Sequence, residues 1–480
     1  MDESLLFLLV GGVLALSVIV ALVASRVGVP ALFAFLVFGM LLGTDGVGDI
    51  GFYDVELARI VGTIGLVVIL FEGGLSTSWR RLREAFIPAV MLSTVGVVTT
   101  ALLTGIAAHF LFDLPWLYSF LLGAVVSSTD AAAVFATLRF TQIRRRLARI
   151  LEAESGGNDP MAIALTIGFI AWIEQPVYGI ENLGLLIVQQ LGLGLIVGLV
   201  LGRTAVHVFS HLPHSIGAFS PVASISMAFL SFGFAEAIGG SGFLAVYIVG
   251  LAIGSTPSRY RGPLTMFHEG VAFLAQVAMF ITLGLFVVPH KLLMIAAPSM
   301  ILVLLLIIII RPLAVWLSLS ARNFSYAERG LIGWAGLRGA VPIVLATYVL
   351  SAELPYGDLM FNIVFFIVLA SVLIQGASLD WVAKMLGVID DMPVDKSDAP
   401  QHAMEKIYFQ VSAQHAISGA MVNEVGLPPR ARIVEIKRRA DKIKFDKDTV
   451  IRSRDRLCVE APYSIHPEIE DVFMRWRRRV

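Results

Sequence analysis

Thirteen apolar stretches, separated by short polar loops, are the feature that most constrains how this 480-residue chain can fold. An α-helix needs about 20 mainly apolar residues to cross the hydrocarbon core of a bilayer. Hydrophobic residues make up 57% of the chain and charged residues only 15%, which excludes a soluble globular protein. The sequence therefore predicts an all-α polytopic membrane domain with thirteen transmembrane helices. The predicted spans are 5–25, 29–43, 57–75, 86–112, 116–137, 150–173, 183–208, 219–237, 242–255, 264–288, 292–318, 328–350 and 359–388.

The distribution of charge sets the end of the chain apart. Residues 400–480 hold 16 of the 36 Lys and Arg residues and 11 of the 36 Asp and Glu residues. We therefore predict a membrane domain over 1–390, a linker over 391–401 and a small α+β cytosolic domain over 402–480. The net positive charge of this last domain suits a nucleotide or an anionic lipid, or simply a solvated surface. The alternation of its side chains predicts strands at 406–411, 431–436 and 456–459, and a helix at 413–425.

Basic residues are concentrated in every second loop, which predicts the orientation of the chain. The N-terminus is expected outside and the C-terminus in the cytoplasm of a multi-pass protein of the cell (inner) membrane. The first apolar run lacks a basic n-region, so we expect it to remain as the first helix. The basic loops carry Arg26; Arg80, Arg81 and Arg83; Arg139, Arg144, Arg145, Arg146 and Arg149; Arg259 and Arg261; and Arg322 and Arg329.

An internal repeat is visible in the apolar part. Residues 28–39 resemble 239–250, and residues 69–73 resemble 280–284, both at an offset of 211. Seven predicted helices separate the partners, so the two copies cross the membrane in opposite directions. Inverted repeats of this kind are typical of secondary transporters.

The fifth and twelfth apolar stretches are related by the same offset, and both look irregular. The fifth contains the small and polar run 123–130, and the twelfth contains the Gly- and Pro-rich run 333–342. We expect both helices to be broken at mid-membrane, because irregular backbone there is tolerated where it lines a cavity and supplies ion ligands. The alternative is ordinary packing of Gly-rich helices.

Polar residues that lie within the apolar stretches are the candidate functional residues. A charge at that depth costs at least about 2.5–3.5 kcal/mol. Because burial disfavours the charged form of a carboxylate, a proton and a cation compete for it. Asp159 is the first candidate for this exchange and Asp130 the second. The buried polar set comprises Glu72, Thr129, Asp130, Glu154, Ser155, Asn158, Asp159 and Arg338.

Structural roles are the alternatives for several of these residues. Asp159 could cap a helix that begins near Pro160, and Asp130 could also be a helix cap. Glu72 could be a ligand at the entrance of the site or could extend to water. Arg338 remains charged and needs a buried acid, so we predict a structural ion pair with Glu154.

Four motifs resemble the NhaP branch of the cation/proton antiporters, and within it the potassium/proton subgroup known as cell volume regulation protein A. They are residues 71–75, 127–135, 154–161 and 333–342. The resemblance implies a homodimer, an elevator motion of a core domain against a dimerisation domain, and electroneutral one-for-one exchange. Ala131 replaces the Pro of many sodium-type relatives, which favours the potassium subgroup. The implied ion- and proton-binding residues, which would hold the monovalent cation, are Asp159, Asp130, Asn158, Ser155, Thr129 and Glu72, with Glu154 and Arg338 as an ion pair.

The C-terminal region is similar to the C-terminal half of regulatory domains of potassium-conductance proteins (RCK domains). This similarity implies a small cytosolic regulatory ligand, for example a nucleotide. We expect no other cofactor besides the transported K⁺ or Na⁺ and H⁺. The expected partners are a second copy of the chain and membrane lipid, and no nucleic acid.

Together these features predict a monovalent cation/proton antiporter that serves pH, cation and volume homeostasis and is regulated by its cytosolic domain. The alternative is a ligand-gated cation channel. A channel needs a selectivity filter of stacked carbonyls, and the sequence contains no repeat of that kind. We expect no enzymatic activity, because the sequence shows neither a nucleophile with a base nor metal-binding Cys and His spacing.

Overall fold

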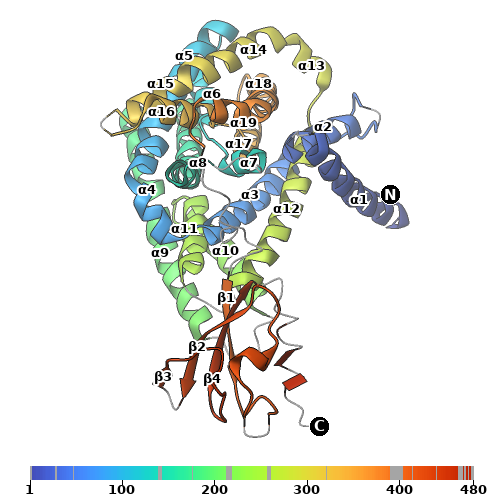
Figure 1. Cartoon of the computed structure of the whole chain (residues 1–480). Coiled ribbons are helices and arrows are strands. Elements are labelled where there is room, and N and C mark those ends of the chain that lie inside the picture. Colours follow the sequence, from blue (N-terminus) through green and yellow to red (C-terminus); the bar gives the residue numbers. More distant parts are fainter. Residues whose placement is uncertain are drawn as a thin grey trace. The chain divides into compact units, whose positions relative to one another are not determined.

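The computed structural model describes residues 3–27, 30–46, 48–138, 143–175, 177–211, 219–256, 261–320, 322–389, 404–412, 415–438, 441–462, 469, 472–473 and 475–476. The chain divides into two compact units, residues 1–390 and 391–480 (Figure 1). The predicted linker, residues 391–401, lies outside the described residues.

The first unit is built of helices, and a helix or a broken helix lies at each predicted apolar stretch. The elements of its first half are α1 (Glu3–Val27), α2 (Ala31–Leu42), α3 (Val55–Ser76), α4 (Trp79–Met91), η1 (Leu92–Gly96), α5 (Val97–Phe112), α6 (Trp116–Val125), α7 (Ala131–Thr137), α8 (Arg145–Glu174) and α9 (Ile180–His211). Those of its second half are α10 (Ser220–Ala237), α11 (Gly242–Ser255), α12 (Arg261–Leu285), α13 (Pro289–Met294), α14 (Ala296–Leu305), η3 (Leu306–Ile310), α15 (Arg311–Ser318), α16 (Tyr326–Trp334), α17 (Ala340–Ser351), α18 (Gly357–Ser371), η4 (Val372–Gly376) and α19 (Ala377–Met385).

Within the described residues, five helical segments are long and apolar enough to cross a membrane by length and composition. They are Leu82–Phe112, Ile180–His211, Gly262–Leu285, Ala296–Ser318 and Gly357–Met385. Many large apolar side chains on these helices remain exposed. Such a surface is stable in a lipid environment and not in water.

The helices of the first unit pack as two groups. In one group α2 packs on α12, α3 on α11 and α12, and α9 on α10 and α11. In the other, α4, η1, α5, α6 and α8 pack together, and α14, α15, α17 and α18 complete the group. Contacts of α3 with α17 and of α8 with α9 connect the groups. The two broken helices, α6–α7 and α16–α17, both belong to the second group.

Two pairs of glycines allow helices of the first group to approach at backbone distance. A Cβ atom placed on Gly39 in α2 would lie 2.9 Å from the Cα atom of Gly284 in α12, and the reverse substitution is equally close. Gly74 in α3 and Gly250 in α11 form a second reciprocal pair, since a Cβ atom on either would overlap the backbone of the other helix. Close approach of this kind is how small residues stabilise helix contacts in membranes.

The predicted irregularity of the fifth and twelfth stretches is confirmed. The fifth stretch is helical up to Val125 (α6) and again from Ala131 (α7). The twelfth is helical up to Trp334 (α16) and again from Ala340 (α17). Each break begins with a turn and continues as irregular backbone. The two breaks are in contact, because the backbone N–H of Asp130 donates to the carbonyl of Leu337 at 2.8 Å. The second break therefore provides a hydrogen-bond acceptor for a backbone N–H group of the first.

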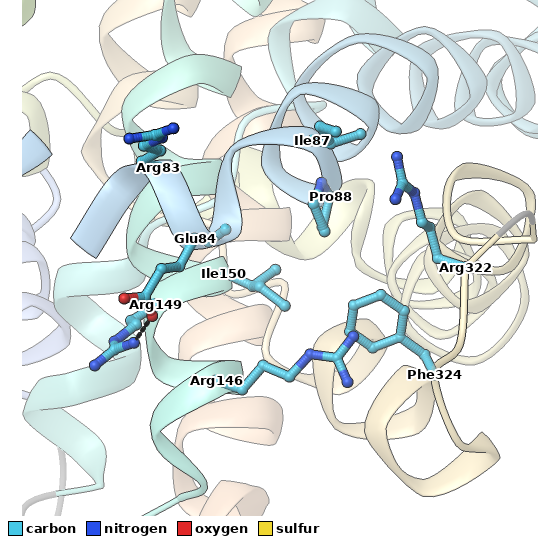
Figure 2. Close-up of a pocket in the computed structure, with 10 residues that line it drawn as sticks. Arg83, Glu84, Ile87, Pro88, Arg146, Arg149, Ile150, Arg322 and Phe324 are labelled. Carbon is cyan, nitrogen blue, oxygen red and sulfur yellow. Dashed lines mark hydrogen bonds and ion pairs between the residues drawn. The ribbon is translucent and has the colours of Figure 1, made fainter. Parts of the chain in front are cut away.

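A pocket of about 480 Å³ lies where α4, α8 and the loop between α15 and α16 meet (Figure 2). It is lined by residues of these three segments, including Arg83, Arg146 and Arg322.

The second unit is a four-stranded antiparallel sheet. Its strands are β1 (Met404–Gln410), β2 (Arg432–Arg438), β3 (Asp441–Ile443) and β4 (Arg456–Pro462), in the order β1-β4-β2-β3. Ile436, Leu457 and Val459 are buried in its apolar core. The three predicted strands are confirmed, and β3 was not predicted.

The helix predicted at 413–425 is wrong. Its described residues form turns, followed by a 3₁₀ helix at Val422–Val425. Gly419, in the middle of this segment, has a φ angle of 111°, which a helix does not accommodate. The apolar spacing of this segment reflects packing of turns against the sheet, as the burial of Ile417 and Val425 shows.

A buried carboxylate holds the end of β2 to the start of β4. Asp455 is fully buried and accepts hydrogen bonds from Arg438 Nε at 2.9 Å and Arg438 Nη2 at 2.8 Å. It also accepts from the backbone N–H of Arg452 at 2.8 Å. The hydrogen bonds with this carboxylate raise the pKa of Arg438 above its usual value.

We expect Asp455→Ala to destabilise this unit by about 2–3 kcal/mol. This is less than the loss of a fully buried ion pair, because the Arg438 side chain keeps 28% of its surface exposed. Faster hydrogen exchange in β2 and β4 of the full chain measures the effect. Glu460→Ala is the matched control, since its partner Arg432 is 71% exposed and the pair contributes at most about 1 kcal/mol. Equal effects of the two substitutions would contradict the assignment.

Candidate functional site

The helix α8 carries four of the predicted site residues on one continuous element. It runs from Arg145 to Glu174, and Pro160 lies in its interior. Asp159 is therefore not the cap of a helix that begins near Pro160. Because Pro160 has no backbone N–H, the carbonyl four residues earlier lacks its helical partner, next to the polar residues.

The break between α6 and α7 lies directly against this part of α8. Asn158 Nδ2 donates to the carbonyl of Thr129 at 3.3 Å and also to its hydroxyl. Ser128 Oγ donates to Asp159 Oδ1 at 2.6 Å. Ser155 Oγ accepts from the backbone N–H of Ala131 at 3.3 Å. The structure thus brings Thr129, Ser155, Asn158 and Asp159 together, as the sequence predicts.

Asp130 joins this cluster from the end of the same break. It caps α7, since Oδ1 accepts from the backbone N–H of Ala133 at 3.1 Å. The capping role, one of the two alternatives, is therefore confirmed. Oδ2 lies against Gly339 of the second break, where a Cβ atom would overlap the carboxylate. One oxygen of Asp130 is thus engaged by the helix, and the other faces the crossing of the two breaks.

The cluster is buried and keeps polar atoms that are not fully used. Asn158 is fully buried, and Thr129 and Asp159 are only 4% and 6% exposed. Within the part of the chain that the structure describes, Asn158 Oδ1 has no hydrogen-bond partner. Buried polar atoms are almost always paired, so an unpaired acceptor beside a carboxylate indicates a place for a donor or a cation.

Glu72 is not part of this cluster. It is half-buried in α3, and its Oε1 accepts from Ser76 Oγ at 2.6 Å. No hydrogen bond to the other five predicted residues is found in the described ranges. Whether it serves as an entrance ligand or extends to water stays open, as in the sequence prediction.

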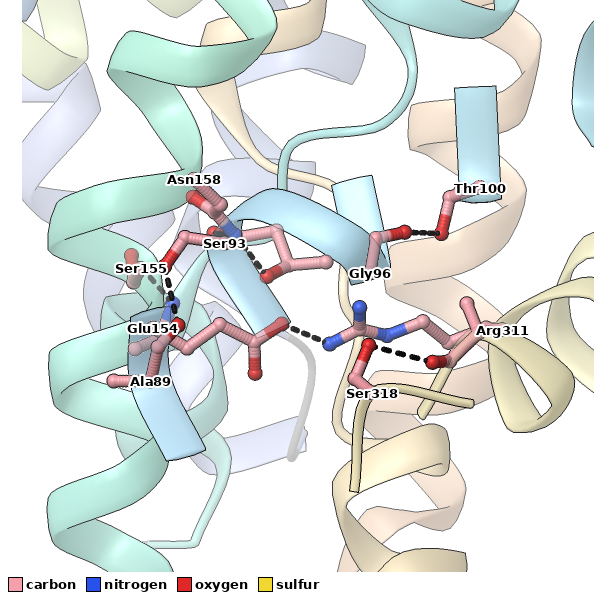
Figure 3. Close-up of polar contacts among 12 residues, drawn as sticks. Ala89, Ser93, Gly96, Thr100, Glu154, Ser155, Asn158, Arg311 and Ser318 are labelled. Atoms are coloured by element: carbon pink, nitrogen blue, oxygen red, sulfur yellow. Dashed lines mark hydrogen bonds and ion pairs between the residues drawn. The ribbon is translucent and has the colours of Figure 1, made fainter. Parts of the chain in front are cut away.

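The predicted ion pair between Glu154 and Arg338 is wrong. Glu154 pairs with Arg311, the first residue of α15, and both side chains are 1% exposed (Figure 3). Arg338 Nη1 instead donates to the carbonyls of Ser127 at 2.9 Å and Ser128 at 2.6 Å. These carbonyls are freed where α6 ends, and the negative end of the helix dipole also favours a cation there. Arg338 is therefore stabilised by backbone oxygens.

Arg311 and Ser128 are the residues that the sequence analysis missed. Arg311 is the only charged residue in the apolar stretch 292–318, and a charge in such a stretch signals a functional or structural partner. That signal could have identified it as a competitor for Glu154. Ser128 carried no such signal, because a serine within a membrane helix usually bonds to its own backbone.

Two broken helices that cross beside buried carboxylates define a class of protein, the secondary transporters with discontinuous helices. Residues 12–385 match the family described as sodium/hydrogen exchanger, transmembrane. The chain belongs to this family.

Proteins of known activity support the assignment over nearly the whole chain. The chain is 38% identical over 463 residues to the K(+)/H(+) antiporter NhaP2 of Shewanella sp. (strain MR-4), covering 94% of this chain and 80% of that protein. It is 37% identical over 481 residues to the K(+)/H(+) antiporter NhaP of Alkalimonas amylolytica, covering 98% and 83%. The Na(+)/H(+) antiporter ApNhaP of Aphanothece halophytica is 26% identical over 414 residues, covering 82% and 78%.

A solved structure shows the same fold. The sodium proton antiporter MjNhaP1 from Methanocaldococcus jannaschii at pH 8 superimposes with a TM-score of 0.71 at 24% sequence identity. The match covers 81% of this chain and all of that one. The family resemblance predicted from the four motifs is therefore confirmed.

The partner of Glu154 can be tested with double-mutant cycles. Glu154→Gln combined with Arg311→Gln should deviate from additivity by about 1–3 kcal/mol, because the two side chains are in contact. Glu154→Gln combined with Arg338→Gln should give a smaller coupling. Thermal unfolding of the purified full chain in detergent measures both. A larger coupling to Arg338 would restore the ion pair predicted from the sequence.

Proposed function

We propose that this protein is a monovalent cation/proton antiporter in which Asp159 alternately binds a proton and a cation. The observation that carries the proposal is the position of this carboxylate. It is buried beside the broken helix α6–α7, where Ser128 donates to it and the neighbouring Asn158 donates to the Thr129 carbonyl. A single carboxylate that must release one ion to bind the other couples the two movements directly.

The remaining site residues would complete the coordination of the cation. Asn158 Oδ1 is unpaired among the described residues, and Asp130 Oδ2 faces the crossing. With Ser155 and the Thr129 carbonyl, these groups supply the oxygens that a hard monovalent cation requires. Because Asn158 stands where a second carboxylate would add charge, we expect exchange of one cation for one proton.

Potassium is the cation that we propose. The relatives at 37–38% identity are K(+)/H(+) antiporters, and the Na(+)/H(+) antiporter is 26% identical. Ala131 agrees with this choice. The ligand-gated channel is not favoured, because the family and these relatives are ion exchangers.

The architecture that we propose has thirteen transmembrane helices in two inverted repeats. The two glycine contacts support it. Gly39 and Gly250 are 211 residues apart, and so are Gly73, the neighbour of Gly74, and Gly284. The α2–α12 contact is thus the counterpart of the α11–α3 contact. Arg338 and Ser127, which are also 211 residues apart, are in contact. An axis that relates the repeats must pass close to such a contact.

The two packing groups support an elevator motion. The ion site lies within the group that contains α8 and both broken helices, so this group can move as one body against α2, α3 and α9–α12. We propose that the latter group contains the homodimer contact. The N-terminus would lie outside, and the C-terminal unit would lie in the cytoplasm of a cell (inner) membrane protein.

Replacement of Asp159 tests the proposed site. In proteoliposomes with a luminal pH dye, an inward K⁺ gradient should raise the luminal pH, and Asp159→Asn should reduce this to background. Asp358→Asn is the matched control, because this exposed aspartate lies at the start of α18, outside the cluster. Exchange by the Asp159 variant at the rate of the control would contradict the assignment.

Voltage distinguishes the antiporter from a channel. One-for-one exchange moves no net charge, so the rate should not change when the membrane potential is clamped at different values. A current that follows the voltage without movement of protons would instead establish a channel. Na⁺ and Li⁺ gradients in the same assay measure the choice of cation.

We also propose that the C-terminal unit regulates exchange, with a small cytosolic ligand such as a nucleotide. A chain that ends at Leu386 keeps every predicted site residue. It should therefore still exchange ions, with an altered dependence of rate on cation concentration or pH. Identical profiles for the shortened and the full chain would argue against regulation by this unit.

A further inference from the structure

The pocket between α4, α8 and the α15–α16 loop is separate from the ion site and carries an excess of positive charge. Arg83 on α4, Arg146 and Arg149 on α8, and Arg322 in the loop all line it (Figure 2). Glu84 is the acidic residue of the lining, and it forms an ion pair with Arg149. Three arginines therefore contribute charge that no acid of the pocket neutralises.

The local contacts show how this charge is held. The guanidinium of Arg146 lies over the ring of Phe324, 4.1 Å from its centroid, and donates to the carbonyl of Asn323 at 3.3 Å. These contacts orient the group without removing its charge. Arg83 and Arg322 are exposed, and neither has an acidic partner in the part of the chain that the structure describes. Guanidinium groups in this situation suit phosphate oxygens, which they bind through paired N–H donors.

The position of the pocket in the fold also favours an anion. Its α8 residues, Arg146, Arg149 and Ile150, lie in the first two turns of that helix, where the helix dipole favours negative charge. Ile87, Pro88 and Ile150 form an apolar part of the wall, and Ile87 is 50% exposed. The wall of the pocket thus combines arginines with apolar side chains.

We propose that this pocket binds a phosphate-bearing anion, held by Arg83, Arg146 and Arg322. Two sources offer this chemistry: the headgroup of an anionic phospholipid and a soluble phosphate. Since the pocket joins α4, α8 and the loop before α16, a bound phosphate connects three segments of the helix group that contains the ion site. Occupancy therefore stabilises these segments against local opening.

Hydrogen exchange of the full chain in lipid vesicles tests the proposal and separates the two sources. One arm compares vesicles of phosphatidylcholine with vesicles of phosphatidylcholine and phosphatidylglycerol. The other adds inorganic phosphate to phosphatidylcholine vesicles, against chloride at equal ionic strength. Occupancy should slow exchange in residues 79–91, 145–151 and 322–326 by roughly tenfold, equivalent to about 1.4 kcal/mol. Slowing by phosphatidylglycerol alone identifies a lipid, and slowing by phosphate identifies a soluble anion.

The double variant Arg83→Gln/Arg322→Gln should lose this protection, because it removes two of the three unneutralised charges. Its matched control is Arg26→Gln/Arg203→Gln, which removes two exposed arginines at the end of α1 and on α9. Unchanged exchange elsewhere in α8 and in α17 shows that both variants are folded. The proposal is overturned if neither probe slows exchange in the original chain. It is equally overturned if the pocket variant responds like the control, since the effect is then a general one of surface charge.

Discussion

The structure depends on one constraint: charged and polar groups inside an apolar helix bundle must find partners within the protein. Two helices stop at mid-length and cross, and the breaks supply these partners to each other. Asp130 donates its backbone N–H to Leu337, and Arg338 donates to the carbonyls of Ser127 and Ser128. Unpaired backbone groups cost several kcal/mol in such surroundings, so neither break is stable without the other.

The crossing also determines what the neighbouring carboxylates can do. Glu154 is bound by Arg311, and Oδ1 of Asp130 caps the N-terminus of α7, so both carboxylates have a structural contact. In the described part of the chain, the contact of Asp159 is a single hydrogen bond that it accepts from Ser128. A bound cation can replace this hydrogen bond. The acid with the weakest structural attachment is thus Asp159, the residue that we propose for exchange. Glu154, Asp130 and Asp159 lie close to the crossing, and they differ in their structural contacts because their neighbours differ.

Much of the fold followed from patterns that the bilayer enforces. Apolar stretches predicted the helices, and the Gly- and Pro-rich runs predicted both breaks, because irregular backbone inside a membrane has few permitted locations. The cluster of Thr129, Ser155, Asn158 and Asp159 followed from the spacing on α8 and from the motif at 127–135. The helix expected at 413–425 is wrong, because Gly419 has a left-handed backbone angle that interrupts it. The backbone N–H of Gly419 donates to the carbonyl of Ile451 at 2.8 Å, a contact between segments that the local sequence pattern does not reveal.

The sequence by itself determined the family, the helical membrane fold and the residues of the proposed ion site, since hydrophobicity and motif spacing act locally along the chain. Only the tertiary structure decided which charges pair. Arg311 and Arg338 are equally charged and both fully buried or nearly so, and nothing in their own segments says which one faces Glu154. The answer depends on how α15 and the second break pack against α8, and on the free carbonyls at the end of α6. Those carbonyls accept two hydrogen bonds from Arg338 Nη1 where no acid of the described residues is in contact, and Arg311 is the partner of Glu154.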